Sequence, residues 1–129
     1  MLLSEDKITT LLVKLNKLTS LDQLSWRVTE PPRFIAKGTD DFIPFFMTAT
    51  YKGQSFALYQ QRYQSYDGDR DRFYWSERVT FAILDFEGRV LWETPRYSSA
   101  LADLFETARR KVSNVDGILD NLLSSDDEA

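Results

Sequence analysis

The strongest constraint on the fold is an apolar stripe near the C-terminal end of the chain. Apolar residues recur there in alternating steps of four and three, at Leu101, Phe105, Ala108, Val112, Val115, Leu119 and Leu122. This spacing keeps all of them on one side of an α-helix. The pattern predicts one long helix from about Leu101 to Leu123, with Ser98 or Ser99 as its N-cap.

Two features inside the stripe bear on whether this helix is continuous. Gly117 lowers the helix propensity by about 1 kcal/mol relative to Ala, and the stretch from Ser113 to Asp116 would also suit the start of a separate helix. Because the apolar seam keeps its phase, we expect a single helix. Its second half would then extend past the sheet, which makes four residues candidates for binding a partner: Val115, Ile118, Leu119 and Leu122.

The rest of the chain predicts another helix followed by strands. Apolar residues at helical spacing indicate a helix from about Ser4 to Leu18. Segments with β propensity follow at residues 24–28, 34–36, 45–52, 55–66, 73–84 and 89–93. The turns between them are too short for parallel crossovers.

We therefore expect an α+β fold in one domain spanning residues 1–129. An antiparallel β-meander of four to six strands would carry an N-terminal helix and a long C-terminal helix on one face. The strand count within residues 31–54 stays open, and residues 124–129 should form a frayed acidic tail. The expected core comprises Leu11, Leu15, Trp26, Phe56, Phe81, Ile83, Trp92, Leu104, Phe105, Ala108 and Val112.

Charge is unevenly distributed along the chain. Residues 1–96 carry 13 basic and 13 acidic side chains, whereas residues 97–129 carry three basic and seven acidic ones. The net charge of −4 therefore arises entirely at the C-terminal end. Because a non-specific nucleic-acid binder needs the opposite sign, we do not expect nucleic acid as a partner.

The sequence contains neither His nor Cys. Imidazole and thiolate metal sites, thiolate nucleophiles and Ser-His-Asp chemistry are therefore excluded. Carboxylates are plentiful, but no spacing singles out a catalytic pair. We expect no catalytic residues, no cofactor and no metal. The chain shows no signal-peptide pattern and no apolar run near the ~20 residues of a membrane span, so we expect a soluble cytoplasmic protein.

A central region rich in aromatic and arginine residues is the second candidate site. Its members are Tyr59, Arg62, Tyr63, Tyr66, Arg70, Arg72, Tyr74 and Trp75. Such residues can stack on bases or anchor a protein partner, but they can also stabilise a long hairpin through cross-strand pairs. We favour the hairpin, because Tyr59 and Tyr63 share one strand face while Arg62 lies on the other.

The loop between the two longest predicted strands alternates carboxylates, as calcium loops do: Asp67, Asp69 and Asp71. An EF-hand loop needs a glycine and a bidentate glutamate at later positions. Here those positions hold Arg72 and Arg78. We therefore favour a solvated hairpin tip over a calcium site.

The C-terminal residues also resemble a known pattern. Leu104 to Arg110, followed by Asn114-Val115-Asp116 and then Ile118 to Leu123, is similar to the "ARR…NVD…LL" helix that ends many small bacterial proteins. Those proteins have an N-terminal helix and a short antiparallel meander. The resemblance implies this architecture and a bacterial origin, and it implies no activity.

Three functions fit these observations. The favoured one is a non-catalytic protein-binding or regulatory protein of the adaptor, chaperone or inhibitor type. Its partner would be another protein or a second copy in a homodimer. The alternative is a ligand- or nucleic-acid-binding module that uses the aromatic and arginine residues, which must then be exposed. A carboxylate-based enzyme has the least support, since it needs a pocket holding a carboxylate of raised pKa.

Overall fold

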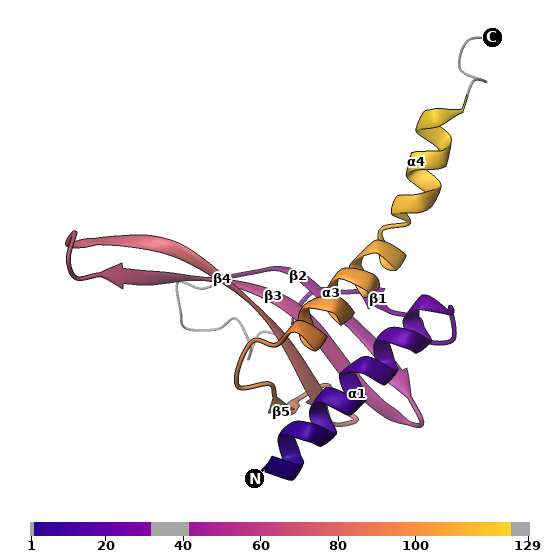
Figure 1. Cartoon of the computed structure of the whole chain (residues 1–129), viewed down its shortest axis with the longest axis horizontal. Coiled ribbons are helices and arrows are strands. Elements are labelled where there is room, and N and C mark those ends of the chain that lie inside the picture. Colours follow the sequence, from indigo (N-terminus) through magenta and orange to yellow (C-terminus); the bar gives the residue numbers. More distant parts are fainter. Residues whose placement is uncertain (1, 32–41, 125–129) are drawn as a thin grey trace.

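Five strands form one antiparallel sheet in the order in which they follow along the chain (Figure 1). The computed structural model describes residues 2–31 and 42–124. Within them the strands are β1 (Arg27–Val28), β2 (Phe42–Tyr51), β3 (Gln54–Asp67), β4 (Arg72–Leu84) and β5 (Val90–Glu93). The meander is confirmed, with five strands among the described residues. The strand expected at residues 34–36 lies outside them.

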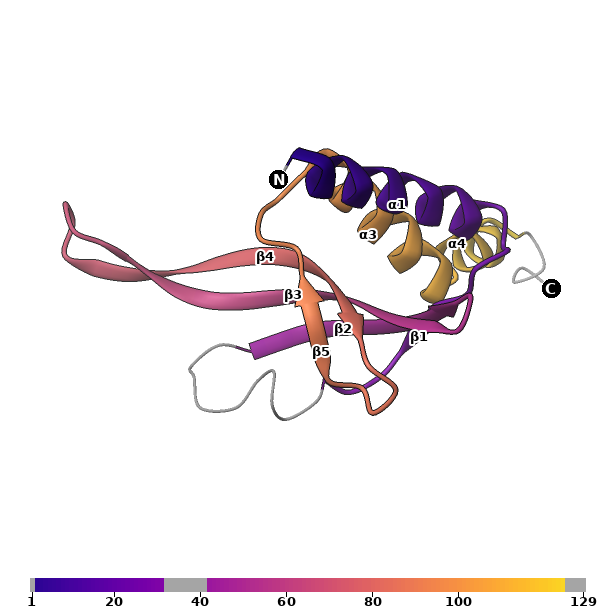
Figure 2. The same cartoon turned by 90° about the horizontal axis from the view of Figure 1, so that it is seen from below.

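Two helices, α1 (Leu2–Ser20) and α3 (Ser99–Val112), lie side by side on one face of the sheet (Figures 1 and 2). The helix α1 extends two residues further at each end than the pattern predicted. At the start of α3 the Ser98 hydroxyl accepts a hydrogen bond from the backbone N–H of Leu101 at 3.2 Å. This confirms the predicted N-cap. The α+β arrangement with helices at both ends is therefore as expected.

Tight turns set the register of the meander. Lys52 and Gly53 join β2 to β3 with φ of 52° and 79°, which suits the right-handed twist of a two-residue hairpin. Between β4 and β5, the Asp85 carboxylate accepts hydrogen bonds from the backbone N–H groups of Glu87 and Arg89, both at 2.9 Å. Both predicted turns are present.

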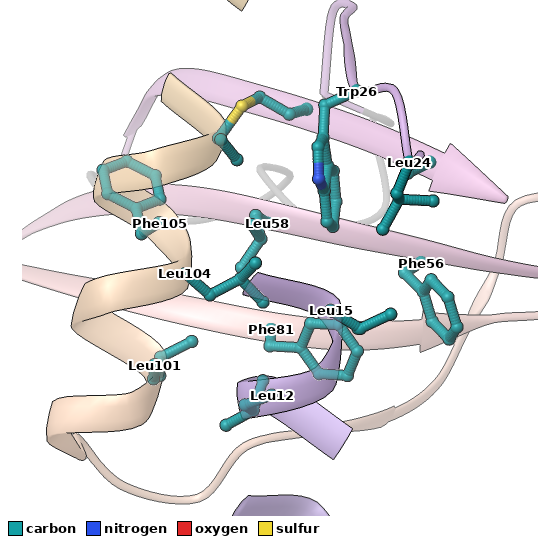
Figure 3. Packing of buried hydrophobic residues seen from close by; sticks show 13 residues of the cluster. Leu12, Leu15, Leu24, Trp26, Phe56, Leu58, Phe81, Leu101, Leu104 and Phe105 are labelled. Carbon is teal, nitrogen blue, oxygen red and sulfur yellow. The ribbon is translucent and has the colours of Figure 1, made fainter. Parts of the chain in front are cut away.

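The main core lies between the two helices and the sheet (Figure 3). Leu15 from α1, Leu104 from α3 and Phe81 from β4 are all fully buried. Other expected core residues that are buried are Trp26, Phe56, Phe105 and Ala108, while Leu11, Ile83 and Val112 are half-buried against the cluster.

One expected core residue is not buried. The side chain of Trp92 is 37% exposed and that of its neighbour Leu91 is 63% exposed. Both belong to β5, which is one of the two edge strands among the described residues and pairs there with Ala82 to Leu84 of β4. A side chain on an edge strand has a neighbouring strand on one side only, so the prediction for Trp92 was wrong.

The expected single C-terminal helix is also wrong. The helix α3 ends at Val112, and a separate helix, α4 (Val115–Leu123), begins after Asn114. Asn114 is left-handed, with φ of 51° and ψ of 45°, a conformation that Asn tolerates better than most residues. A Cβ added at Gly117 would lie 2.5 Å from the side-chain nitrogen of Asn114, so the absence of a side chain there makes room for Asn114.

A two-stranded arm extends from the sheet (Figures 1 and 2). The strands β3 and β4 pair along their whole length, from Ser55 with Leu84 to Asp67 with Arg72. Among the described residues, the pairing of β2 with β3 extends to Arg62, and that of β5 with β4 begins at Ala82. Residues 63–76, which we call the arm, therefore stand clear of the other three strands.

Candidate functional site

The helix α4 presents an exposed apolar face. Its face consists of Val115, Ile118, Leu119, Leu122 and Leu123, and we call it the α4 face. The exposed fractions are 50% for Ile118, 48% for Leu119, 70% for Leu122 and 83% for Leu123, and Val115 is half-buried. Within α4, which the structure describes in full, no residue is buried. The structure therefore brings the four predicted residues together on one exposed surface.

Leu123 was missing from the predicted set. It lies four residues after Leu119, which is the spacing of neighbours on one side of a helix. The step of four from Leu119 is the sequence signal that would have found it, although Leu123 lies outside the alternating seam. Leu123 is the last residue of α4, and this helix extends away from the sheet (Figure 1).

Two ion pairs lie near the N-terminal end of α4. The Nη2 atom of Arg110, in α3, lies 3.2 Å from Oδ1 of Asp116, in α4. The Nζ atom of Lys111 lies 3.1 Å from Oδ1 of Asp22, just after α1. All four side chains are substantially exposed, so each pair contributes little to stability. The pairs link the ends of α1, α3 and α4.

A hollow of about 530 Å³ lies among these charged residues. It is lined by Ser20, Asp22, Thr107, Arg110, Lys111, Asn114 and Asp116. Small-molecule sites are mostly apolar with a few polar groups. Every lining residue here is of a polar or charged type, and each of the two cations faces a carboxylate. The hollow is therefore a weak candidate for binding an organic ligand.

The arm carries most of the predicted aromatic and arginine residues, but on two faces. Ladder partners on one face are Arg62 with Glu77, Gln64 with Trp75, and Tyr66 with Phe73. Ladder partners on the other are Tyr63 with Ser76, Ser65 with Tyr74, and Asp67 with Arg72. The structure therefore divides the predicted set instead of presenting it as one surface.

Four large rings on the arm are exposed, with exposed fractions between 46% and 65%: Tyr66, Phe73, Tyr74 and Trp75. The rings of Tyr66 and Phe73 are 5.2 Å apart between centroids. Phe73 was missing from the predicted set. Counting the ladder inward from the tip would have placed it opposite Tyr66.

The arginines near the arm are largely engaged with neighbours on the same hairpin. Nε of Arg62 lies 3.1 Å from Oε1 of Glu77. The guanidinium of Arg78 lies 5.1 Å from the ring centroid of Tyr63, and Nε of Arg70 lies 3.8 Å from Oδ2 of Asp67. These pairs are typical of a solvated hairpin that satisfies its own charges.

Tyr59 does not belong to the aromatic surface. Its side chain is only 2% exposed and packs in a second apolar cluster with Phe46 and Ala82. Its hydroxyl donates a hydrogen bond to Oε2 of Glu93 at 2.6 Å. Burial, together with this bond and the negative charge of Glu93, raises the pKa of Tyr59 well above its ordinary value. Tyr59 lies where β2 and β4 flank β3, so its ring is covered.

Two of the three alternating carboxylates at the arm tip accept hydrogen bonds from the arm itself. The Asp67 carboxylate accepts hydrogen bonds from the backbone N–H of Asp69 at 3.1 Å and of Arg70 at 3.4 Å. The Tyr66 hydroxyl donates to the Asp71 carboxylate, and this bond raises the pKa of Tyr66. In the part of the chain that the structure describes, no three acidic residues lie close enough to hold a metal ion.

Residues 2–31 and 42–124 include no helix long and apolar enough to cross a membrane. Comparisons with protein-family models, with curated proteins and with solved structures found no match to this chain.

Proposed function

We propose that this chain is a small non-catalytic protein-binding module that acts in the cytoplasm, with α4 as its binding element. The observation that supports this proposal is the exposure of Ile118, Leu119, Leu122 and Leu123 on a helix with no buried residue. Contiguous apolar surface of this kind marks interaction sites on soluble proteins. The helices α1 and α3 together with the sheet supply the folded platform that carries it.

The α4 face is large enough to contribute to binding but too small to give high affinity alone. Burying the exposed parts of these four side chains is worth about 5 kcal/mol in total. Association itself costs roughly 4–15 kcal/mol in lost freedom of motion. A partner must therefore make further contacts, or it binds transiently. Binding that is transient, or that needs further contacts, is typical of regulatory and adaptor proteins.

Photo-crosslinking in living cells tests the proposal. A photoreactive amino acid is placed at Leu122, and a matched variant carries it at Asn121, which lies outside the α4 face. Leu122 should give discrete adducts, identifiable by mass spectrometry, that Asn121 does not give. Equal adducts at both positions, or none at Leu122, would contradict the proposal.

The alternative function, ligand or nucleic-acid binding, is supported by the exposure of Tyr74 and Trp75 on the arm. It is weakened by the division of the rings between two faces and by the pairing of Arg62 and Arg70 with carboxylates. Fluorescence anisotropy with a labelled single-stranded oligonucleotide separates the two ideas. Binding that Trp75→Ala removes would favour the alternative, whereas absence of binding would leave α4 as the better candidate.

A carboxylate-based enzyme has the least support. The carboxylates that line the hollow, Asp22 and Asp116, are 77% and 79% exposed. Raising the pKa of a carboxylate generally needs burial or a like charge close by.

A further inference from the structure

The α4 face has an acidic border on one side. Asp116 and Asp120 are four residues apart, so they lie one above the other on the helix. At 3.6 residues per turn they lie beside the Leu119 and Leu123 edge of the face, away from Ile118. A partner packed on the α4 face would therefore meet two carboxylates along one edge.

The two carboxylates differ in how they are engaged. Asp116 faces Arg110 of α3 at 3.2 Å, and both side chains are exposed. The Asp120 side chain is exposed and makes no hydrogen bond or ion pair with another described residue. A cation from a partner could pair with Asp120 directly, and it could replace Arg110 at Asp116 at little cost because the existing pair is solvated.

The charge of the whole segment points in the same direction. Residues 115–129 contain five acidic residues and no basic one, in a chain whose net charge is −4. The negative charge of the chain is therefore concentrated in the part of the sequence that begins with α4. Opposite charges attract a partner to such a surface and set its orientation.

We infer that the α4 face binds a basic amphipathic helix of another protein, with apolar residues against the α4 face and Lys or Arg residues beside Asp116 and Asp120. This inference rests on the proposed function and adds the chemistry of the partner. A helix fits because Val115, Ile118, Leu119 and Leu122 stand at the i, i+3, i+4, i+7 spacing by which helices recognise one another. Charged residues flanking such a seam determine which partners pair.

A second copy of this chain fits the face less well. Pairing two α4 helices would bring together two segments that each contain five acidic residues and no basic one. In an antiparallel pair the border of Asp116 and Asp120 would face its own copy, and like charges at flanking positions oppose pairing.

The test uses the full chain and two synthetic amphipathic helical peptides with identical leucine positions. One peptide has Lys at the flanking positions and the other has Glu, and binding is measured by fluorescence anisotropy at low and high NaCl. The Lys peptide should bind at least about 10-fold more tightly at low salt, and the difference should shrink as salt screens the charges.

Variants of α4 locate the binding. Leu119→Ser with Leu122→Ser should abolish binding of the Lys peptide, whereas Val13→Ser, at an exposed position on α1, should not change it. Asp116→Lys with Asp120→Lys should reverse the preference between the peptides. Asp103→Lys with Glu106→Lys, at two exposed acidic positions on α3, changes the net charge by the same amount and is the matched charge control. Circular dichroism verifies that each variant is folded.

Several outcomes would overturn the inference. If the Lys peptide binds the Leu119→Ser, Leu122→Ser variant as tightly as the native chain, the binding reflects charge alone. Self-association in sedimentation velocity that Leu122→Ser removes would make a second copy the occupant. Crosslinks from Leu122 to a partner segment without basic residues would refute the inference while leaving the proposed function intact. No crosslink at Leu122 and no peptide binding would refute both.

Discussion

The indole N–H of Trp26 donates a hydrogen bond to the hydroxyl of Thr19 at 3.0 Å. That hydroxyl donates in turn to the backbone carbonyl of Leu15 at 2.7 Å. Thr19 is fully buried in the last turn of α1, and Trp26 is 8% exposed just before β1. These two hydrogen bonds connect the residue before β1 to the last turn of α1. They also satisfy the polar groups of both buried side chains.

Replacing Thr19 with Val should destabilise the fold. Valine has nearly the same shape but leaves the buried indole N–H without an acceptor, which costs about 1–3 kcal/mol. Urea unfolding followed by tryptophan fluorescence measures this change. The control Thr19→Ser keeps the hydroxyl and should cost less. If Thr19→Val lowers the free energy of unfolding no more than Thr19→Ser does, the hydrogen bond between Trp26 and Thr19 contributes little to stability.

The bond between Tyr59 and Glu93 predicts a dependence of stability on alkaline pH. Because the pKa of Tyr59 is raised in the folded chain, the unfolded chain releases the phenol proton first, near pH ~10. The contribution of Tyr59 to stability is therefore fully present below that pH and declines above it. The decline from this one group should be about 1.4 kcal/mol per pH unit.

Comparison with Tyr59→Phe isolates this effect. The variant should be less stable by about 1 kcal/mol at neutral pH, since it loses the hydrogen bond. Its disadvantage should shrink as the pH rises above ~10. Denaturant unfolding at a series of pH values measures both. A difference that stays constant with pH would show that the phenol proton is not retained in the folded chain.

The local sequence pattern predicted much of the fold, because helix periodicity and tight turns depend on residues that are close together in the chain. The Ser98 cap and the turns at Gly53 and Gly88 needed no knowledge of distant residues. The α4 face was predicted in the same way, since the seam from Val115 to Leu122 is a local feature.

Features that depend on residues far apart in the chain could not be predicted from the sequence. In the part of the chain that the structure describes, β2 and β5 pair with β3 and β4 only outside the arm, and the sequences of β3 and β4 do not determine how far their neighbours extend. Tyr59 and Tyr63 share a strand face, but only Tyr59 is flanked by strands on both sides. The break at Asn114, by contrast, is a local feature. The stretch from Ser113 to Asp116 indicated it as the alternative, but the unbroken apolar phase favoured a single helix, and one left-handed residue ends a helix without disturbing that phase.

The break between α3 and α4 should be removable. Alanine at position 114 disfavours the left-handed conformation by about 1–2 kcal/mol, and without the Asn114 side chain a Cβ at position 117 has room. Asn114→Ala with Gly117→Ala should therefore give one continuous helix. Electron-electron distance measurements between spin labels at Asp103 and Asn121 should show a longer and narrower distribution.

The single variants provide the control for this prediction. Gly117→Ala alone retains the left-handed Asn114, whose exposed side chain can rotate away from the new Cβ, so it should leave the distance distribution unchanged. Asn114→Gly should leave the distance unchanged, because glycine adopts positive φ freely. If the double variant has the same distance distribution as the native chain, residues other than these two cause the break.

The arm should be dispensable for folding. None of residues 64–75 is buried, and Tyr63 and Ser76 are ladder partners, so a two-residue Asn-Gly turn can join them as a type I′ hairpin. Replacing residues 64–75 with Asn-Gly should change the melting temperature by less than about 4 °C. The matched control Phe81→Ala, at a fully buried position of the same strand, should cost about 3–5 kcal/mol. Thermal unfolding measures both. A shortened chain that melts as early as Phe81→Ala would make the arm part of the folding unit, whereas an unchanged melting temperature would leave its four exposed rings without a structural role.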